Sequence, residues 1–199
     1  MMLTELTAVP TVALPVFQFR DHLKLGTGFA DDGAEDGLLE TYLRAAIAAV
    51  EAWTGKALIT RDFMFELTEW RQADAQALPV APVTQILSVA AVDSEGAETV
   101  VPADRYRLVK DTHRPFVRAS SACLPTIPTN GSARVHFYAG FGSVWTDVPA
   151  DLAHAVIMLA AYYHEYRHEA RIGAAQIPYG VSCLIAGWRV MRLRGGGLD

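Results

Sequence analysis

The sequence has few cysteines, no long apolar run and no excess of positive charge. Its 199 residues include two cysteines, Cys123 and Cys183, which are sixty positions apart and lack a CxxC spacing. This excludes a disulfide framework or a zinc ribbon and predicts reduced, partly buried thiols. The most apolar run, Leu152–Tyr163, is twelve residues long, too short to cross a bilayer. Residues 1–10 lack the basic and apolar regions of a signal peptide, so we expect a protein made in the bacterial cytoplasm, without a membrane segment.

The charge is weakly negative and unevenly distributed. Seventeen Lys and Arg residues against 22 Asp and Glu residues give a net charge of -5, which disfavours a protein that wraps nucleic acid with its whole surface. Residues 187–199 contain three arginines and one aspartate, a charge of +2, so the remainder carries -7. Hydrophobic residues make up 51% of the chain, enough for a proper core. The sequence therefore predicts an acidic folded body with a basic C-terminal segment.

Two long helices are expected, one near each end of the folded part. Apolar residues at three- and four-residue spacing predict a helix over 37–53. Asp36 is a candidate N-cap for this helix, and Gly55 suits the left-handed position after its end. A second helix is expected to start with Pro149 at its first position and to run to about Arg171.

Between these helices the pattern changes to strand-like alternation. Apolar and polar residues alternate over 58–70, and 83–92 is rich in β-branched residues and leads into the turn sequence DSEG. Shorter strands are expected at 99–101, 105–109, 116–118 and 134–138. The middle third is therefore predicted to be a small, mostly antiparallel β module.

The order helix, β insertion, helix predicts an α+β fold. We expect a helical core of two long helices plus short helices, an inserted antiparallel β module and an extended C-terminal arm. A short helix is expected within 15–25, and a final apolar piece spans 181–191. The corresponding division is 1–56 and 146–186 for the two parts of the helical core, 57–145 for the β module and 187–199 for a basic docking arm.

One motif resembles a zinc site. His164, Glu165 and His168 form the sequence HEYRH, and helical spacing would place both histidines on one face with the glutamate able to activate water. A catalytic zinc needs a third protein ligand, and no histidine follows His168. We therefore favour ordinary polar residues at a helix end, with no catalytic residue and no cofactor. A zinc-dependent hydrolase is the alternative.

The basic C-terminal segment alternates apolar and guanidinium side chains. Its candidate interface residues are Trp188, Arg189, Met191, Arg192 and Arg194, since aromatic and arginine side chains are favoured anchors at protein interfaces. The alternative is a frayed terminus whose charges serve solubility.

A set of short stretches, in a fixed order along the chain, resembles the head–tail connector (adaptor) proteins of long-tailed bacteriophages and gene transfer agents. The stretches are DGLLETYLRAAIAAVEAWTGKAL at 36–58, Leu78-Pro79, Pro82-Val83, Asp93-Ser94-Glu95-Gly96, Tyr106, VHFYAGFG at 135–142, Val148-Pro149, Tyr163, Glu165, Arg167, Pro178, Gly180, Leu184, Ile185 and Arg189. Each one is short, but together they cover most of the chain.

The resemblance implies a virion protein at the head–tail interface. It implies a ring, typically of twelve copies, that docks beneath the portal protein, receives the next connector or stopper protein of the tail and lets DNA pass without specific binding. It further implies that the C-terminal segment contacts the portal, and that Glu165 and Arg167 belong to a Tyr/Glu/Arg cluster without a metal. His164 and His168 depart from the family's usual residues. A stopper or tail-completion protein of the same conduit is the structural alternative.

Overall fold

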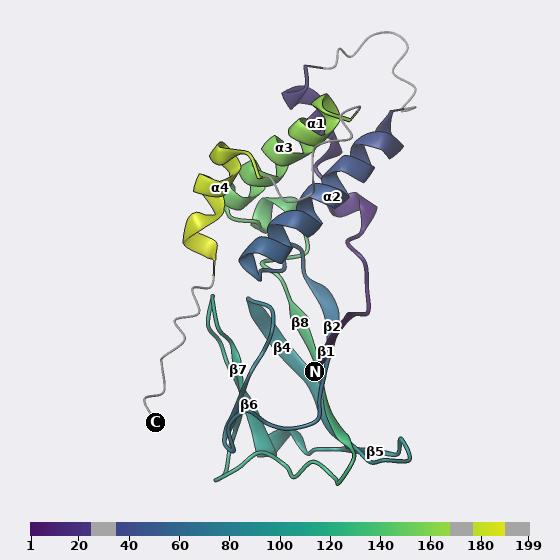
Figure 1. Ribbon diagram of the computed structural model, residues 1–199, viewed down its shortest axis with the longest axis vertical. Coiled ribbons are helices and arrows are strands. Elements are labelled where there is room, and N and C mark those ends of the chain that lie inside the picture. Colours follow the sequence, from purple (N-terminus) through teal and green to yellow (C-terminus); the bar gives the residue numbers. More distant parts are fainter. Residues whose placement is uncertain (25–34, 168–176, 190–199) are drawn as a thin grey trace.

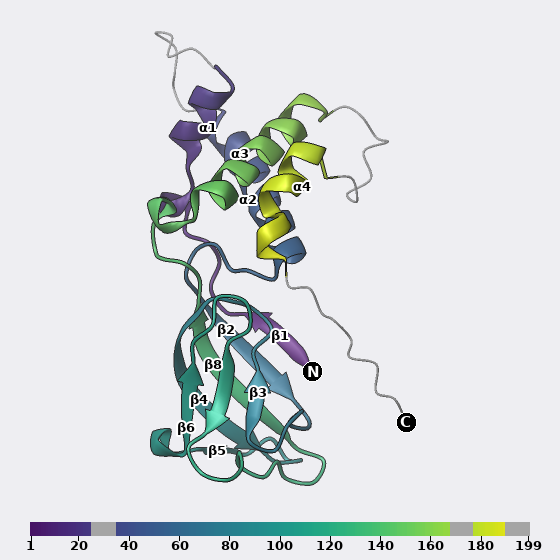
Figure 2. The same ribbon diagram turned by 90° about the vertical axis from the view of Figure 1, so that its left-hand side faces the viewer.

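The computed structural model describes residues 1–24, 35–167 and 177–189, which form a helical layer stacked end to end on a β layer (Figures 1 and 2). The mixed α+β fold predicted from the sequence is confirmed. In the described residues the α-helices are α1 (Val16–His22), α2 (Asp36–Thr54), α3 (Ala150–Glu165) and α4 (Tyr179–Ile185). Short 3-10 turns are η1 (Thr11–Ala13), η2 (Ala103–Arg105), η3 (Trp145–Asp147) and η4 (Ala186–Trp188). None of the helices in these ranges has the length and apolarity needed to cross a membrane.

The helical layer is built on the packing of α2 against α3. The apolar stripe expected for α2 is buried, with Leu39, Leu43 and Val50 fully enclosed, and Leu152 and Leu159 of α3 face the same cluster. Each such side chain contributes about 1.5–3 kcal/mol relative to an exposed one. The helical layer therefore has a hydrophobic core of its own.

The two ends of α2 differ from each other in how they are stabilised. Gly55 adopts the expected left-handed conformation, with φ of 68°, and its amide donates to the Glu51 carbonyl. The N-cap prediction is wrong: Glu35 precedes the helix without a side-chain cap, and Asp36 is the first helical residue. The Asp36 carboxylate pairs instead with the Arg20 guanidinium, which ties α1 to the start of α2.

Helix α3 starts and ends differently from the prediction. Pro149 is extended, with ψ of 137°, and forms the N-cap position rather than the first turn. The helix ends at Glu165, short of the expected Arg171, which lies outside the described residues. The Arg167 guanidinium donates to the carbonyl of His164 at 2.8 Å, which satisfies one of the acceptors that a helix end leaves open.

Two antiparallel sheets face each other in the β layer (Figure 2). The five-stranded sheet has the order β1-β2-β8-β4-β5 and the three-stranded sheet the order β3-β7-β6. The strands are β1 (Met2–Glu5), β2 (Arg61–Leu67), β3 (Ala75–Ala77), β4 (Val83–Val92), β5 (Glu98–Val100), β6 (Tyr106–Val109), β7 (Phe116–Ala119) and β8 (Ser132–Ala139). Between the sheets, the rings of Phe63 and Phe137 stack at 5.9 Å beside the buried Val117 and Val135.

Two of these strands, β1 and β3, were not expected from the sequence. All four residues of β1 are exposed, so no alternation marks them, and β3 has three residues. Strand β1 depends on its pairing with β2, from Met2 opposite Glu66 to Glu5 opposite Phe63. The first residues of the chain therefore belong to the five-stranded sheet.

Both cysteines are exposed, so the expectation of partly buried thiols is wrong. Cys123 lies in the loop between β7 and β8, and Cys183 lies on α4. Because both side chains reach the surface, thiol chemistry at either position would not require the fold to open.

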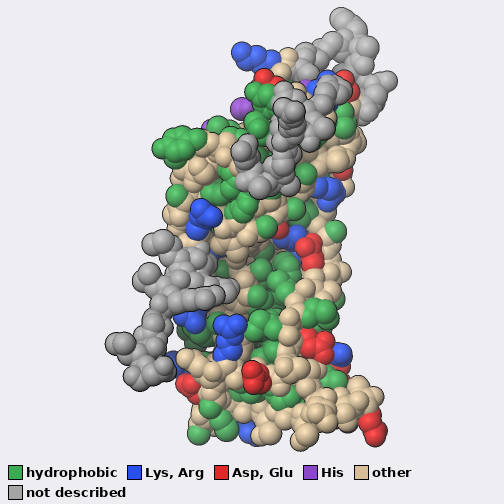
Figure 3. All heavy atoms as spheres, in the orientation of Figure 1, with side chains coloured by type: hydrophobic (Ala, Val, Ile, Leu, Met, Phe, Trp, Pro, Cys, Tyr) green, Lys and Arg blue, Asp and Glu red, His purple; other side chains and the backbone are tan. Residues whose placement is uncertain are grey.

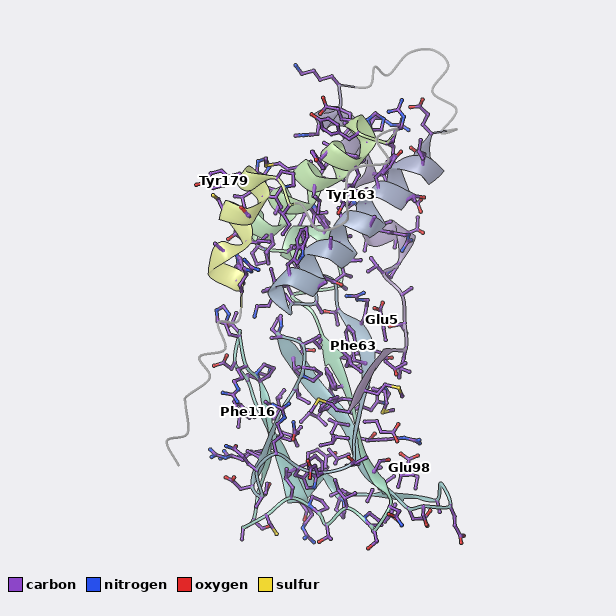
Figure 4. The ribbon with its side chains drawn as sticks, viewed as in Figure 1. Glu5, Phe63, Glu98, Phe116, Tyr163 and Tyr179 are labelled. Atoms are coloured by element: carbon purple, nitrogen blue, oxygen red, sulfur yellow. The ribbon has the colours of Figure 1, made fainter. Side chains whose placement is uncertain are left out.

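A buried arginine joins the two layers. The Arg61 guanidinium, 5% exposed, donates to both carboxylate oxygens of Glu51 on α2 at 2.6 Å and to Glu5 on β1 at 2.7 Å. Glu51 also accepts the backbone amide of Leu58 at 2.7 Å. Burial raises the pKa of Glu51, while the Arg61 charge opposes the rise. Figure 4 shows Glu5 beside Phe63 at the helix-facing end of the sheet.

Replacing Arg61 with alanine should lower the free energy of unfolding by about 3–5 kcal/mol near pH 8, because Glu51 would remain buried without its partner. A raised pKa in the folded state means that this carboxylate's contribution to stability declines as the pH rises through that pKa. Without Arg61 the pKa rises further, so the loss should be smaller at pH 5 than at pH 8. Urea unfolding at both pH values measures it.

The matched control is Arg118→Ala, since the Arg118–Asp74 ion pair is about half exposed on both sides. That variant should change stability by about 1 kcal/mol or less. Equal losses for the two variants would show that the buried Arg61 contributes no more to stability than a surface ion pair does.

Candidate interaction site at the root of the C-terminal segment

The last described residues, 186–189, lie at the junction between the helical layer and the β layer, which we call the waist. Helix α4 packs on α3, and its C-terminal end is directed toward the β layer (Figures 1 and 2). Val181 and Ile185 are buried in the helical core, which fixes α4 in place. The turn η4 then carries Trp188 to the waist.

Trp188 is half-buried and contacts three parts of the chain. Its indole Nε1 donates to the Asp151 carboxylate in the first turn of α3 at 2.6 Å. Its ring meets Phe141 edge-on at 5.4 Å and lies 6.2 Å from the His113 ring in the β6–β7 connection. A hydrogen bond to a charged acceptor contributes about 1.5–3 kcal/mol. Trp188 therefore anchors the start of the C-terminal segment, which we call its root, to both layers.

A buried lysine contacts the His113 ring. Lys56 follows Gly55, is 1% exposed, and places Nζ 3.3 Å from Nδ1 of His113. Burial lowers the pKa of Lys56, and the nearby Asp111 carboxylate opposes that shift. Because an ammonium group only donates, Nδ1 of His113 is the acceptor of this contact. No pattern in the sequence distinguishes Lys56 from a surface lysine.

The β6–β7 connection is itself ordered by Asp111. Its carboxylate accepts the backbone amides of His113 at 2.7 Å and Arg114 at 2.6 Å, and these bonds lower the pKa of Asp111. The turn thus presents the His113 ring to Trp188 and Lys56 together.

The interface residues predicted from the sequence fall into two groups. Trp188 contacts its own chain, and Arg189 is exposed just beyond it. Met191, Arg192 and Arg194 lie outside the described residues. The role of these five side chains in an interface stays a prediction.

The HEYRH motif lies at the far end of α3 from this site. His164 is half-buried and meets the Tyr42 ring edge-on at 5.7 Å, and Glu165 is exposed. His168 lies outside the described residues. Across residues 1–24, 35–167 and 177–189 no three His, Cys, Asp or Glu side chains are grouped so that they could hold a metal ion. The described part of the motif thus offers packing and exposed charge.

Comparison with known proteins places these features in context. No protein-family model matches the chain, and no curated protein matches it. A solved structure of the neck of an empty GTA particle, computed with C6 symmetry, is 55% identical, with a TM-score of 0.90 and coverage of 98% of this chain and 99% of that one. A virion structure of a native gene transfer agent (GTA) particle is 56% identical at a TM-score of 0.86, and a native GTA neck with C12 symmetry is 50% identical at 0.83, both with the same coverage.

These likenesses extend over nearly the whole of both chains and include the waist. They show the class of protein to which the chain belongs: it is a structural component of a virion-type particle. More particularly, the chain belongs to the family of neck proteins of gene transfer agent particles.

Replacing Asp151 with alanine should release η4 from the waist, because the Trp188 indole would lose its charged acceptor. Amide hydrogen exchange at residues 186–189 should accelerate by about tenfold or more, the equivalent of 1.4 kcal/mol or more. Asp151→Asn keeps an acceptor oxygen and should show a smaller change. Unchanged exchange in the alanine variant would show that the hydrogen bond does not hold the segment.

Metal analysis provides a direct test of the HEYRH motif. We expect the purified protein to contain much less than one zinc ion per chain, and His164→Ala to leave that content unchanged. A stoichiometric zinc content that His164→Ala removes would instead favour the hydrolase alternative.

Proposed function

We propose that this protein is the head–tail adaptor of its particle. It forms an oligomeric ring beneath the portal protein, joins the capsid to the tail and provides part of the wall of the DNA conduit. The observation that carries this proposal is the match, at 50–56% identity over 98% of the chain, to structures of GTA necks and a GTA virion. The C6 and C12 symmetries of those necks support a ring.

The shape of the subunit supports a connecting role. Its helical end and its β end are built from different secondary structure on one elongated body, each around its own core (Figure 1). A ring built from head-to-tail contacts needs two different faces on each copy, and a connector needs different ends for the proteins above and below it. The subunit offers both.

The charge distribution supports passage of DNA rather than its retention. The chain outside residues 187–199 carries -7, so a wall made from it does not attract phosphates. The basic residues of the C-terminal segment are then available to another protein.

The same segment supplies the proposed contact with the portal. Trp188 is engaged at the waist, so it holds the root of the segment in place. Arg189, Met191, Arg192 and Arg194 follow that root and are the residues that we assign to the portal interface.

Removal of residues 190–199 should abolish docking to the purified portal while leaving the subunit folded. The deletion starts after Arg189 because Trp188 belongs to the waist. Electron microscopy of portal mixed with the full chain should show an added ring, and the truncated chain should give none. Circular dichroism checks that the truncated chain keeps its fold.

A charge variant makes the same test without truncation. Arg189, Arg192 and Arg194 changed together to glutamine should weaken docking at least tenfold, whereas the exposed Arg105, Arg107 and Arg114 of the β layer, changed in the same way, should leave it unaltered. Docking of the truncated chain would refute the portal contact. If the full chain binds only after another connector has joined the portal, the protein is a stopper rather than an adaptor.

A further inference from the structure

The first strand exposes an unusual amount of apolar surface. Met1, Met2, Leu3 and Leu6 are 66%, 58%, 39% and 48% exposed. They belong to or flank β1, which forms one edge of the five-stranded sheet. In Figure 3 hydrophobic side chains run as a strip along the edge of the β layer that faces the viewer, where the N-terminal strand lies.

This edge has little of the usual protection against association. Strand β1 pairs with β2 on one side and with no described strand on the other. Natural edge strands are commonly blunted by lysine, proline or a free charge, but the sequence MMLTEL contains no lysine or proline. Its one charged side chain, Glu5, is already paired with Arg61. An open apolar edge of this kind calls for a partner.

At the opposite edge of the same sheet, none of the described strands pairs with the outer side of β5. Strand β5 pairs with β4, and all three of its residues are exposed, Val100 by 65%. Val100 lies in the same cross-strand row as Met2, through Ala90, Arg134 and Glu66. Val100 and Met2 therefore point to the same face of the sheet.

The strand directions make the two edges compatible in a ring. All four pairings in the five-stranded sheet are antiparallel, so β1 and β5, the first and fifth strands across the sheet, run in the same direction. In a ring of twelve, each copy is turned by a twelfth of a turn, 30°, relative to the next, and in a ring of six by 60°. Such a rotation cannot reverse a strand, so β1 of one copy meets β5 of its neighbour in the parallel sense.

We propose that β1 of one copy lies along β5 of the next copy as a parallel pair, so that the five-stranded sheets join into a belt around the ring. This inference rests on the ring of the proposed function and names the surface that forms it. The occupant is a second copy, because one sheet carries both edges in compatible directions and the related necks are rotationally symmetric.

The strand number sets the size of such a belt. Five strand spacings of about 4.8 Å give about 24 Å per copy, and about 290 Å around twelve copies. β1 and β5 are offset along the strand direction, since β1 faces residues 63–66 of β2, whereas β5 faces residues 90–92 of β4. A closed belt absorbs such an offset by tilting its strands against the ring axis, as β-barrels do.

Disulfide trapping in assembled particles tests the pairing. Cys123 and Cys183 are first changed to serine, since both are exposed. Val100→Cys is then combined with Met2→Cys or with Thr4→Cys, which share its face of the sheet and cover two registers. Neighbouring strands bring Cα atoms within the 4.4–6.8 Å that a disulfide requires. At least one combination should give a ladder of covalent oligomers. Each copy has one thiol on β1 and one on β5, so it can be crosslinked to both of its neighbours.

The controls separate the possible outcomes. Leu3→Cys with Val100→Cys places the thiols on opposite faces and should crosslink at least tenfold less. Three results would each overturn the inference while leaving the proposed function standing. They are dimers from Thr4→Cys alone, crosslinks to a different protein, and necks that contain the ring but give no ladder. Absence of the unmodified protein from the necks would instead overturn the proposed function.

A charge exchange gives a second readout. Met2→Lys together with Val100→Lys should lower ring assembly at least tenfold, since the two substitutions place like charges on the same face of the contact. Met2→Lys together with Val100→Glu should restore it. Equal assembly in both variants would refute the contact, provided that thermal unfolding shows both subunits to be folded.

Discussion

The architecture depends on how two layers with separate cores are held as one body. Each layer buries its own apolar cluster, one around α2 and α3 and the other between the two sheets. Apolar packing alone would allow two such layers to tilt against each other. The Arg61 guanidinium restrains that movement, because it bonds α2 and β1 at once while it starts β2. A planar group with several fixed donors suits this position better than a lysine.

Long periodic elements were predictable from the sequence, whereas the joint between the layers, formed by Arg61 with Glu51 and Glu5, was not. The stripe of α2 and the alternation of β2 follow from burial on one face. Arg61 occupies a buried position at the start of that alternation, where the pattern alone would place an apolar residue. Lys56 is similarly hidden from pattern analysis, since its contact with His113 comes from the distant turn at residues 111–114. Contacts between distant segments leave no local signal.

The site shows the same division. Trp188 was conspicuous in sequence as an aromatic residue in a basic segment, but its partners Asp151, Phe141 and His113 come from three other parts of the chain. Asp151 lies in the first turn of α3, where its negative charge interacts favourably with the helix dipole. Its second role, as the acceptor for an indole far along the chain, required the tertiary structure.

The unprotected edge of β1 is best understood through the role of Glu5. A carboxylate on an edge strand ordinarily discourages a second strand from pairing there, yet this one is directed to Arg61 and so serves the joint between the layers. The same contact that unites the layers therefore neutralises the charge that would guard the edge. In a monomeric protein such an arrangement would be selected against, because open apolar edges lead to uncontrolled association. A subunit whose family assembles in necks of sixfold and twelvefold symmetry has a use for it. One ion-pair network thus serves both the contact between the layers and the readiness of the β1 edge for a neighbour.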